Sequence, residues 1–351
     1  PATGHRMAQR IIPEADGHIF FPFDLPVITE RIVNIVNPKA IILIETELWP
    51  NFLRLAWRKK IPVMMMNGRI SGRSMRRYSL IKRFTTRMLL QIRKFCMQSK
   101  IDRERIISMG AIPQRVVITG NTKYDQTYAE VSEEERAKLR REFRFEGKGP
   151  IIVAGSTHGG EEEIVVRTFG KILEKYPDAR LLLAVREITR AASVRFMIKH
   201  QGYTVLRRSK MGTDEDDGKG AQIVILDTIG ELGRLYSLAD VVFVGGSFVK
   251  VGGHNILEPA AHGKPVLVGP YMFNFQEIFV LLSQRGVCIM TPDEKSFETT
   301  LLDLLGNPEK MKKMGEAALE VVHENQGATE RNIASFEELV KEYGIKLRGK
   351  A

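Results

Sequence analysis

Short apolar runs alternate with stretches of helical periodicity along most of the chain. The runs have the length of buried strands and are rich in Val, Ile and Leu. Amphipathic helical patterns lie between several of them, for example at 161–175 and 298–305. Strands that are apolar on both faces are typical of parallel sheets covered by helices on both sides, so we predict an α/β protein. The strands are predicted at 41–44, 63–66, 116–118, 151–154, 180–184, 223–226, 241–244 and 265–268.

A charged segment at 132–149 interrupts this alternation. It reads as a helix with Ser132 as N-cap and Glu135 in the capping-box position, and a new strand follows at 151. A chain of 351 residues is long enough for two domains. We therefore predict domains at 1–145 and 146–351, the second ending in one or two helices between 310 and 343. The polar, glycine-rich stretch 209–220 is predicted to be an exposed loop.

The charge of the chain is concentrated in one place. There are 53 Lys and Arg residues against 42 Asp and Glu, a formal charge of +11. Residues 48–101 contain fourteen basic residues and no acidic one, and the remainder is slightly acidic. A solvated helix face usually carries both signs, so this stretch favours a polyanionic partner, which could be nucleic acid, an anionic membrane or a phosphorylated substrate. Its interleaved apolar residues suit a basic amphipathic helix at a membrane interface.

Several classes of protein are excluded by missing motifs. Cys96 and Cys288 are too few and too far apart for a disulfide framework or a thiolate zinc site. There is no H-E-x-x-H, P-loop or G-x-G-x-x-G, so a protein-held catalytic metal and a Rossmann dinucleotide site are not expected. Ser156 and Ser247 lack a G-x-S-x-G context. No apolar run approaches the roughly 20 residues that span a bilayer.

Polar residues follow the predicted strands of the first half, at the edge where parallel sheets bind ligands. Glu45 and Glu47 follow strand 41–44. One of them could act as a general base or hold a substrate hydroxyl, or both could simply favour a helix N-terminus. Lys123 is either an anion ligand or part of a surface turn. The basic candidates for acceptor or membrane contact are Arg69, Arg73, Arg76, Arg77, Lys82, Arg83 and Lys123.

Two glycine-bearing motifs follow strands of the second half. The first, Ala-Gly-Ser-Thr-His-Gly-Gly-Glu-Glu at 154–162, is a strand, a turn and a helix start, an arrangement whose free amides bind phosphate; His158 is a candidate phosphate ligand or a plain turn residue. The second, at 244–259, has four glycines in nine residues, which packing alone hardly explains. Within it, Asn255 and Glu258 are three apart and share a helix face, and Glu258 can accept both hydroxyls of a ribose.

Taken together, six motifs carry a resemblance to a known family. The chain resembles the Kdo (3-deoxy-D-manno-octulosonic acid) transferases of lipopolysaccharide biosynthesis, in the same order over nearly its whole length. The motifs are ETELWPN, NGRIS, GNTKYD, AGSTHGGEE, DTIGEL and GGSFVKVGGHNILEPAAHGKPVLVGP.

The resemblance implies a GT-B fold, with two Rossmann-like domains facing across a cleft and the donor held mainly by the second. It implies inverting transfer of Kdo from CMP-Kdo to a lipid A precursor (lipid IVA), at the cytoplasmic face of the bacterial inner membrane, with no tightly bound cofactor. The catalytic candidates are Glu45 and Glu47. The implied donor-binding residues are Ser156, Thr157, His158, Arg186, Gly230, Glu231, Gly245, Gly246, Gly252, Gly253, Asn255 and Glu258.

The chain departs from the family pattern in two ways. The family base is a glutamate in a Ser-x-Gly-Glu loop near the N-terminus, and neither that loop nor a membrane anchor is found, so we expect both upstream of Pro1 and expect residues 1–351 to have little activity alone. In addition, Glu187 stands where the family usually has histidine, beside Arg186 and Arg190. Two alternatives remain: a GT-B enzyme that uses a UDP-sugar, and a basic nucleic-acid-binding protein, which would leave the strand-end motifs unused.

Overall fold

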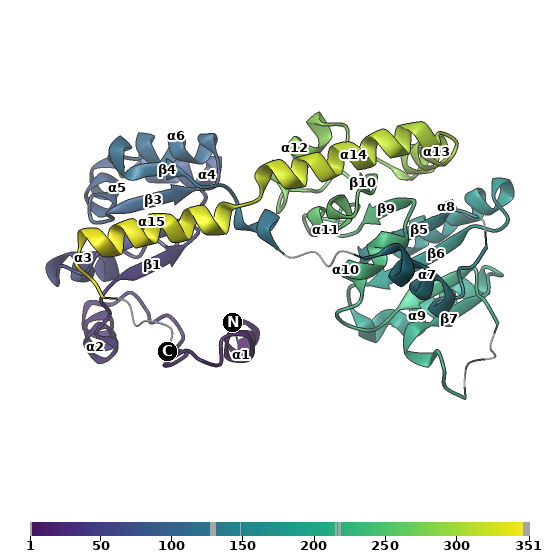
Figure 1. The fold of residues 1–351 in the computed structure, drawn as a ribbon, viewed down its shortest axis with the longest axis horizontal. Helices are drawn as coiled ribbons and strands as arrows, with labels where there is room; N and C mark the ends of the chain where they lie inside the picture. The colour runs from purple at the N-terminus through teal and green to yellow at the C-terminus, as the bar shows by residue number, and fades with distance from the viewer. Residues whose placement is uncertain (1, 127–130, 148, 215, 217–218, 347–351) are drawn as a thin grey trace. The chain divides into compact units, whose positions relative to one another are not determined.

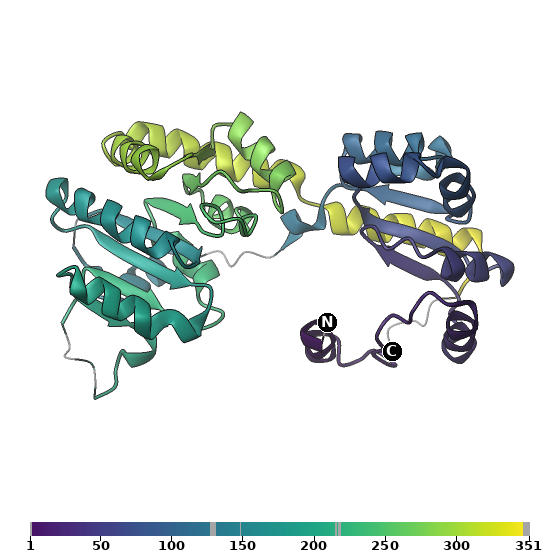
Figure 2. The same cartoon turned by 180° about the vertical axis from the view of Figure 1, so that it is seen from behind.

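The computed structural model describes residues 2–126, 131–147, 149–214, 216 and 219–346. The chain folds into two compact units, each built on a parallel sheet (Figures 1 and 2). Unit 1 comprises Pro1–Asp125 and Gln326–Ala351, and unit 2 comprises Gln126–Asn325. The predicted α/β class with parallel sheets is confirmed.

Unit 1 contains a four-stranded sheet in the order β1-β2-β3-β4. Alternate residues of β2 face opposite layers, because side chains alternate along a strand. Val63 and Met65 join a core with residues of α3, α5 and α6, whereas Met64 packs with Cys96 and with Leu339 of α15. The elements are α1 (Ala2–Ile11), α2 (Pro26–Val36), β1 (Ile41–Ile44), α3 (Pro50–Arg58), β2 (Val63–Gly68), α4 (Gly72–Ser79), α5 (Lys82–Leu89), β3 (Lys94–Met97), α6 (Lys100–Ser108), β4 (Val116–Ile118) and α15 (Ala328–Glu342), with 3₁₀ turns η1 (Pro113–Arg115) and η2 (Thr122–Asp125).

Helix α15, the yellow helix beside β3 in Figure 1, is fixed to unit 1 at its first turn. The carboxylate of Asp125 accepts the backbone N–H groups of Gly327, Ala328 and Thr329. Burial alone would raise the pKa of Asp125, but these hydrogen bonds and one from the Thr329 side chain hold it below its ordinary value. The predicted domains 1–145 and 146–351 therefore differ from the observed units, which assign α15 to the first unit and residues 126–145 to the second.

Unit 2 contains a seven-stranded parallel sheet in the order β11-β10-β9-β5-β6-β8-β7. Phe169 of α8, Val194 of α9 and Phe297 of α13 pack in the core on one face of this sheet. The elements are α7 (Glu133–Glu142), β5 (Ile151–Thr157), α8 (Glu161–Lys175), β6 (Arg180–Val185), η3 (Ile188–Arg190), α9 (Ala191–His200), β7 (Val205–Arg207), η4 (Arg208–Lys210), β8 (Ile223–Leu226), α10 (Leu232–Leu235), η5 (Tyr236–Leu238), β9 (Val241–Val244), α11 (Leu257–Ala261), β10 (Val266–Val268), α12 (Gln276–Gln284), β11 (Cys288–Met290), α13 (Glu294–Leu305) and α14 (Pro308–Asn325).

All eight predicted strands are present, and β3, β7 and β11 were missed. Ser132 is the N-cap of α7 and accepts the backbone N–H of Glu135, as predicted, although α7 ends at Glu142. The loop predicted at 209–220 includes residues 215, 217 and 218, which lie outside the described part of the chain. Among the helices that the structure describes, none combines the length and the hydropathy that a membrane span requires.

The basic stretch 48–101 does not form one amphipathic helix. It runs through α3, β2, α4, α5 and β3. Ile70, Met88, Leu89 and Ile92 within it are buried in the core of unit 1, which explains most of its apolar residues. The corner between α4 and α5 presents Leu80, Ile81 and Phe84 to solvent together with basic side chains, and the end of α3 likewise exposes Trp57 beside Arg58 and Lys59.

Candidate active site

The loops after β5 and β9 come together where the strand order of unit 2 reverses. β5 pairs in parallel with β6 on one side and with β9 on the other. Open parallel sheets bind ligands at the carboxyl ends of the strands at such a switch point. Ser156 and His158 stand at and after the end of β5, and Gly245 and Gly246 follow β9. The structure therefore brings two groups of predicted donor residues to one place.

The buried carboxylate of Glu161, the first residue of α8, joins these two loops. Its side chain is 0% exposed. Oε2 accepts the backbone N–H of His158 (2.9 Å) and of Gly246 (2.7 Å), and Oε1 accepts those of Ser247 (3.0 Å) and Phe248 (2.9 Å). Hydrogen bonds to a charged acceptor are about twice as strong as neutral ones, so this carboxylate fixes both loops. Sequence reasoning gave Glu161 no role, because acidic residues at a helix start are expected on electrostatic grounds alone.

Strand β5 is irregular near its end. Its register with β6 shifts between Ala154 and Thr157, and Ser156 has a φ of +55°, a conformation that non-glycine residues rarely adopt. Thr157 is fully buried, and its hydroxyl donates to the carbonyl of Ala184. The Thr157 hydroxyl therefore serves the sheet. Ser156 has the kind of backbone strain that clusters at functional sites.

The imidazoles of His158 and His254 are in direct contact. Their Nε2 atoms are 2.8 Å apart, and the ring planes differ by 1°. Burial lowers the pKa of His254 to about 4, with further contributions from the charges of His158 and Arg186. His254 is therefore neutral near pH 7. It was not among the predicted donor residues, because 96 residues of sequence separate it from His158.

Packing and backbone conformation both restrict the positions after β9 to glycine. A Cβ added at any of them would come closer than 3.0 Å to another atom of the chain, where real Cβ atoms essentially never lie. Gly252 and Gly253 also have positive φ, which glycine adopts without strain. The closest approaches would be 2.5, 2.9, 2.4 and 2.3 Å at Gly245, Gly246, Gly252 and Gly253.

Asn255 and Glu258 are in contact, as their spacing predicted. Asn255 Nδ2 donates to Glu258 Oε1 (3.1 Å), and Asn255 Oδ1 accepts the backbone N–H of Leu257 at the start of α11 (3.1 Å). Burial raises the pKa of Glu258, although the Asn255 hydrogen bond opposes this. Within the described residues, Oε2 of Glu258 has no hydrogen-bonding partner. This carboxylate is half-buried and keeps one oxygen for a ligand.

Glu231 is bound by the chain itself. It accepts hydrogen bonds from Thr228, from Arg208 (3.0 Å) and from Arg234 (3.2 Å), and Arg208 also pairs with Glu142 of α7. Burial alone would raise the pKa of Glu231, but these hydrogen bonds and charges hold it below its ordinary value. Glu231 thus lies in an ionic cluster that ties α7 to the loop after β8.

The remaining predicted donor residues of unit 2, Arg186 and Gly230, are exposed. Arg186 follows β6, and its charge contributes to the low pKa of His254. Arg190 is engaged nearby by the fully buried carboxylate of Glu162 (2.8 Å). The side chain of Glu187, which replaces the family histidine, is also exposed.

The two candidate catalytic carboxylates lie in unit 1, directly after β1. Both Glu45 and Glu47 are exposed, and Trp49 Nε1 donates to Glu47 Oε2 (2.7 Å). Glu45 has a φ of +61°, and Asn67 at the end of the neighbouring strand β2 has a φ of +52°. Strained non-glycine residues thus stand at the carboxyl ends of both strands.

The basic candidates also lie in unit 1, in the segments between β2 and α5 and after β4. Arg76 and Arg77 are on α4, Lys82 and Arg83 are on α5, and all four side chains are exposed. Arg73 is on α4, and its side chain lies outside what the structure describes. The other two, Arg69 after β2 and Lys123 in η2, are half-buried.

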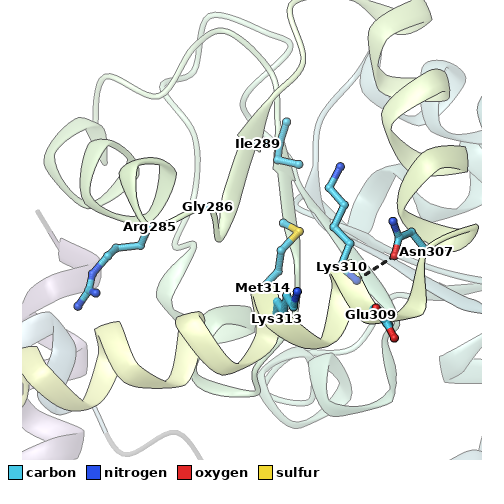
Figure 3. Close-up of a pocket in the computed structure, with 8 residues that line it drawn as sticks. All are labelled: Arg285, Gly286, Ile289, Asn307, Glu309, Lys310, Lys313 and Met314. Atoms are coloured by element: carbon cyan, nitrogen blue, oxygen red, sulfur yellow. Dashed lines mark hydrogen bonds between the residues drawn. The ribbon is translucent and has the colours of Figure 1, made fainter.

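A cavity of about 590 Å³ lies elsewhere in unit 2, beside β11 and α14 (Figure 3). Arg285 and Gly286 precede β11, so this cavity lies near the amino ends of the parallel strands, whereas Glu161 lies at their carboxyl ends. Its basic side chains are partly neutralised, since Arg285 pairs with Glu324 and Lys310 pairs with Asp303. In the described part of the chain, no group of His, Cys, Asp and Glu has the arrangement of a metal site.

Comparisons with known proteins agree with this architecture. Residues 1–126 match the family model "3-Deoxy-D-manno-octulosonic-acid transferase (kdotransferase)", and residues 213–321 match "Glycosyl transferases group 1". The 3-deoxy-D-manno-octulosonic acid transferase of Haemophilus influenzae is 36% identical over 330 residues, covering 94% of this chain and 76% of the relative. That of Bordetella pertussis is 29% identical over 96% of this chain and 79% of its own length. A glycosyltransferase structure from Rickettsia africae shares the fold, with a TM-score of 0.59 at 14% identity over 96% of this chain and 88% of its own.

The chain has two units built on parallel sheets, and polar loops lie where the strand order of unit 2 reverses. Together with the glycosyltransferase matches, these features define a glycosyltransferase of the GT-B fold. The identity to the Haemophilus influenzae enzyme extends over nearly the whole chain. The chain belongs to the family of 3-deoxy-D-manno-octulosonic acid (Kdo) transferases.

Proposed function

We propose that this protein is an inverting glycosyltransferase that moves Kdo from CMP-Kdo to a phosphorylated lipid A precursor (lipid IVA) at the cytoplasmic face of the inner membrane. Membership of the Kdo transferase family supports this reaction. The observation that carries the donor assignment is the half-buried Glu258, whose Oε2 has no partner within the described residues. Glu258 lies in α11, directly after the loop that follows β9 and contains His254. A carboxylate of this kind accepts ribose hydroxyls in nucleotide sites.

The donor contacts divide by chemistry. Glu258 binds the ribose, while His158 and the strained Ser156 border the phosphate with the backbone around Gly252 and Gly253. Arg186 adds positive charge where negative charge develops on the leaving phosphate. Thr157, Gly245, Gly246 and Glu231 act indirectly, because their hydroxyl, packing or carboxylate is already engaged within the chain.

The acceptor chemistry belongs to unit 1. A base must take the proton of the acceptor hydroxyl as that oxygen attacks the anomeric carbon of Kdo, and the bond from this carbon to the phosphate oxygen breaks with its electron pair going to CMP. Glu45 and Glu47 are the proposed groups that hold or deprotonate the hydroxyl. Glu45 is exposed, and its carboxylate has no hydrogen bond or ion pair within the described residues.

The nucleotide preference tests the donor assignment. Four backbone N–H groups of the two loops already donate to Glu161. Fewer backbone donors are therefore left for the second phosphate of a nucleoside diphosphate such as UDP. We expect residues 1–351 to bind CMP at least about tenfold more tightly than UDP in isothermal titration calorimetry, a difference of about 1.4 kcal/mol. Tighter binding of UDP would instead support the UDP-sugar alternative.

The corner between α4 and α5 is the proposed membrane-docking patch. Leu80 is 85% exposed, and Ile81 and Phe84 are each 51% exposed. The basic residues Arg77, Lys82 and Arg83 surround them and are also exposed. Apolar side chains flanked by cations suit a surface that inserts shallowly among anionic headgroups.

The binding of variants to anionic vesicles tests whether this patch docks on a membrane. Each basic residue near an anionic surface contributes about 1 kcal/mol, so the triple variant Arg77→Gln, Lys82→Gln and Arg83→Gln should bind phosphatidylglycerol vesicles about a hundredfold more weakly. Phe84→Asp should weaken binding as well, whereas Phe196→Asp in unit 2 should not, although Phe196 is 70% exposed. Unchanged sedimentation of the triple variant with vesicles would refute the patch, and a preference for duplex DNA over vesicles would support the nucleic-acid alternative.

A further inference from the structure

The side chain of Tyr236 is buried, yet its hydroxyl has no partner in the chain. Tyr236, the first residue of η5, is only 2% exposed. Among the residues that the structure describes, none forms a hydrogen bond with this hydroxyl, and its oxygen is not one of the unpartnered polar atoms that the chain seals from solvent. A buried tyrosine hydroxyl usually finds a hydrogen-bonding partner. This hydroxyl therefore touches solvent and is left for a ligand.

Gly155 places the Tyr236 hydroxyl near the carboxyl ends of the strands. A Cβ added at Gly155 would lie 2.1 Å from Oη and 2.9 Å from Cζ of Tyr236, so only glycine leaves room for the hydroxyl there. Gly155 pairs with Val244, the last residue of β9, and directly precedes the strained Ser156. The hydroxyl thus lies beside the strand ends from which the two donor loops start.

The Oε2 atom of Glu258 lies over the same face of the segment formed by α10 and η5. Gly233 and Tyr236 are three residues apart in this helical segment, a spacing that puts them on one face. A Cβ added at Gly233 would lie 3.9 Å from Glu258 Oε2. Burial and, to a smaller extent, the charge of Glu258 raise the pKa of Tyr236, so its hydroxyl stays protonated. An O–H donor and a carboxylate that can only accept therefore border one place.

We propose that the Tyr236 hydroxyl is a second ribose-binding group, which donates a hydrogen bond to a ribose hydroxyl that itself donates to Glu258. This inference rests on the proposed function of unit 2 as the donor site. A hydroxyl has one O–H and two lone pairs, and a carboxylate satisfies only the O–H. Tyr236 supplies the donor that these lone pairs lack. The two side chains together thus match both hydrogen-bonding sides of a ribose hydroxyl.

Tyr236→Phe removes the hydroxyl alone and separates binding from stability. We expect the dissociation constant of CMP in isothermal titration calorimetry to rise about fivefold, the effect of one neutral hydrogen bond. The urea midpoint measured by circular dichroism should not fall, because the hydroxyl donates to no group of the free chain. Tyr203→Phe is the matched control. Its hydroxyl likewise abuts a glycine, Gly170 of α8, but Tyr203 precedes β7 at the amino ends of the strands, so this variant should bind CMP as the wild type does.

The deoxynucleotides and a double variant identify the contact. The penalty of Tyr236→Phe should vanish with either 2′-deoxy-CMP or 3′-deoxy-CMP, whichever lacks the bound hydroxyl. It should also vanish in the Glu258→Gln background, because the glutamine amide can itself donate to the ribose. An equal penalty in all of these measurements would overturn the proposal, as would wild-type affinity for CMP or a lower urea midpoint in Tyr236→Phe. Failure of the wild type to bind CMP would contradict the donor site itself, and the proposal with it.

Discussion

Glu161→Gln is expected to lower the free energy of unfolding of unit 2 by about 3 kcal/mol and to abolish measurable CMP binding. The wild-type carboxylate accepts four backbone N–H groups in a fully buried position. An amide at this site keeps one oxygen and turns an NH₂ group toward N–H donors, so about two donors lose their partner. Each unsatisfied buried donor costs roughly 1–3 kcal/mol.

The positions of the two tryptophans allow the unfolding of unit 2 to be distinguished from the unfolding of unit 1. Trp49 and Trp57 both lie in unit 1, so their fluorescence follows unfolding of that unit, whereas far-UV circular dichroism follows both units. We expect urea to unfold the Glu161→Gln protein earlier by circular dichroism, with the fluorescence transition unchanged. Glu163→Gln is the matched control, because Glu163 is half-buried and, among the described residues, accepts a single backbone N–H, that of Gly160. If both variants unfolded alike, the structural role of Glu161 would be refuted.

Local pattern was sufficient to predict the strands with continuous apolar runs, such as Ile41–Ile44 and Val241–Val244. The missed strand Lys94–Met97 starts with a charged residue inside the basic stretch, and Val205–Arg207 and Cys288–Met290 have only three residues each. Such segments are strands because their neighbours pair with them. This is a tertiary effect that local preference does not contain.

The domain boundary and half of the site depend on contacts far apart in the sequence. Asp125 binds the start of α15, about two hundred residues away, and no motif in either segment announces this. The same holds for the pair of His158 and His254. Sequence reasoning placed Ser156, His158 and Glu258 at strand ends because parallel sheets bind ligands there. It could not distinguish Glu161, which accepts four backbone N–H groups, from Glu162, which is equally buried but pairs with Arg190, or from the half-buried Glu163.

Glu258→Gln should weaken CMP binding by about ten- to a hundredfold, because a hydrogen bond to a charged acceptor contributes about 1.5–3 kcal/mol. The discriminating ligand is 2′-deoxy-CMP, which lacks one of the two proposed hydroxyl partners. The wild type should prefer CMP to 2′-deoxy-CMP, and Glu258→Gln should bind the two almost equally. Glu174→Gln, at an exposed position on α8 that pairs with Lys171, should behave as the wild type.

The pH dependence of this preference follows from the environment of Glu258. Burial raises its pKa above the ordinary value of 4.5, and the Asn255 hydrogen bond only partly offsets this. The carboxylate form, which accepts two hydroxyls, is lost as the pH falls through this raised pKa. The preference for CMP over 2′-deoxy-CMP should therefore shrink on acidification. A preference that survives in Glu258→Gln would place the ribose on another residue.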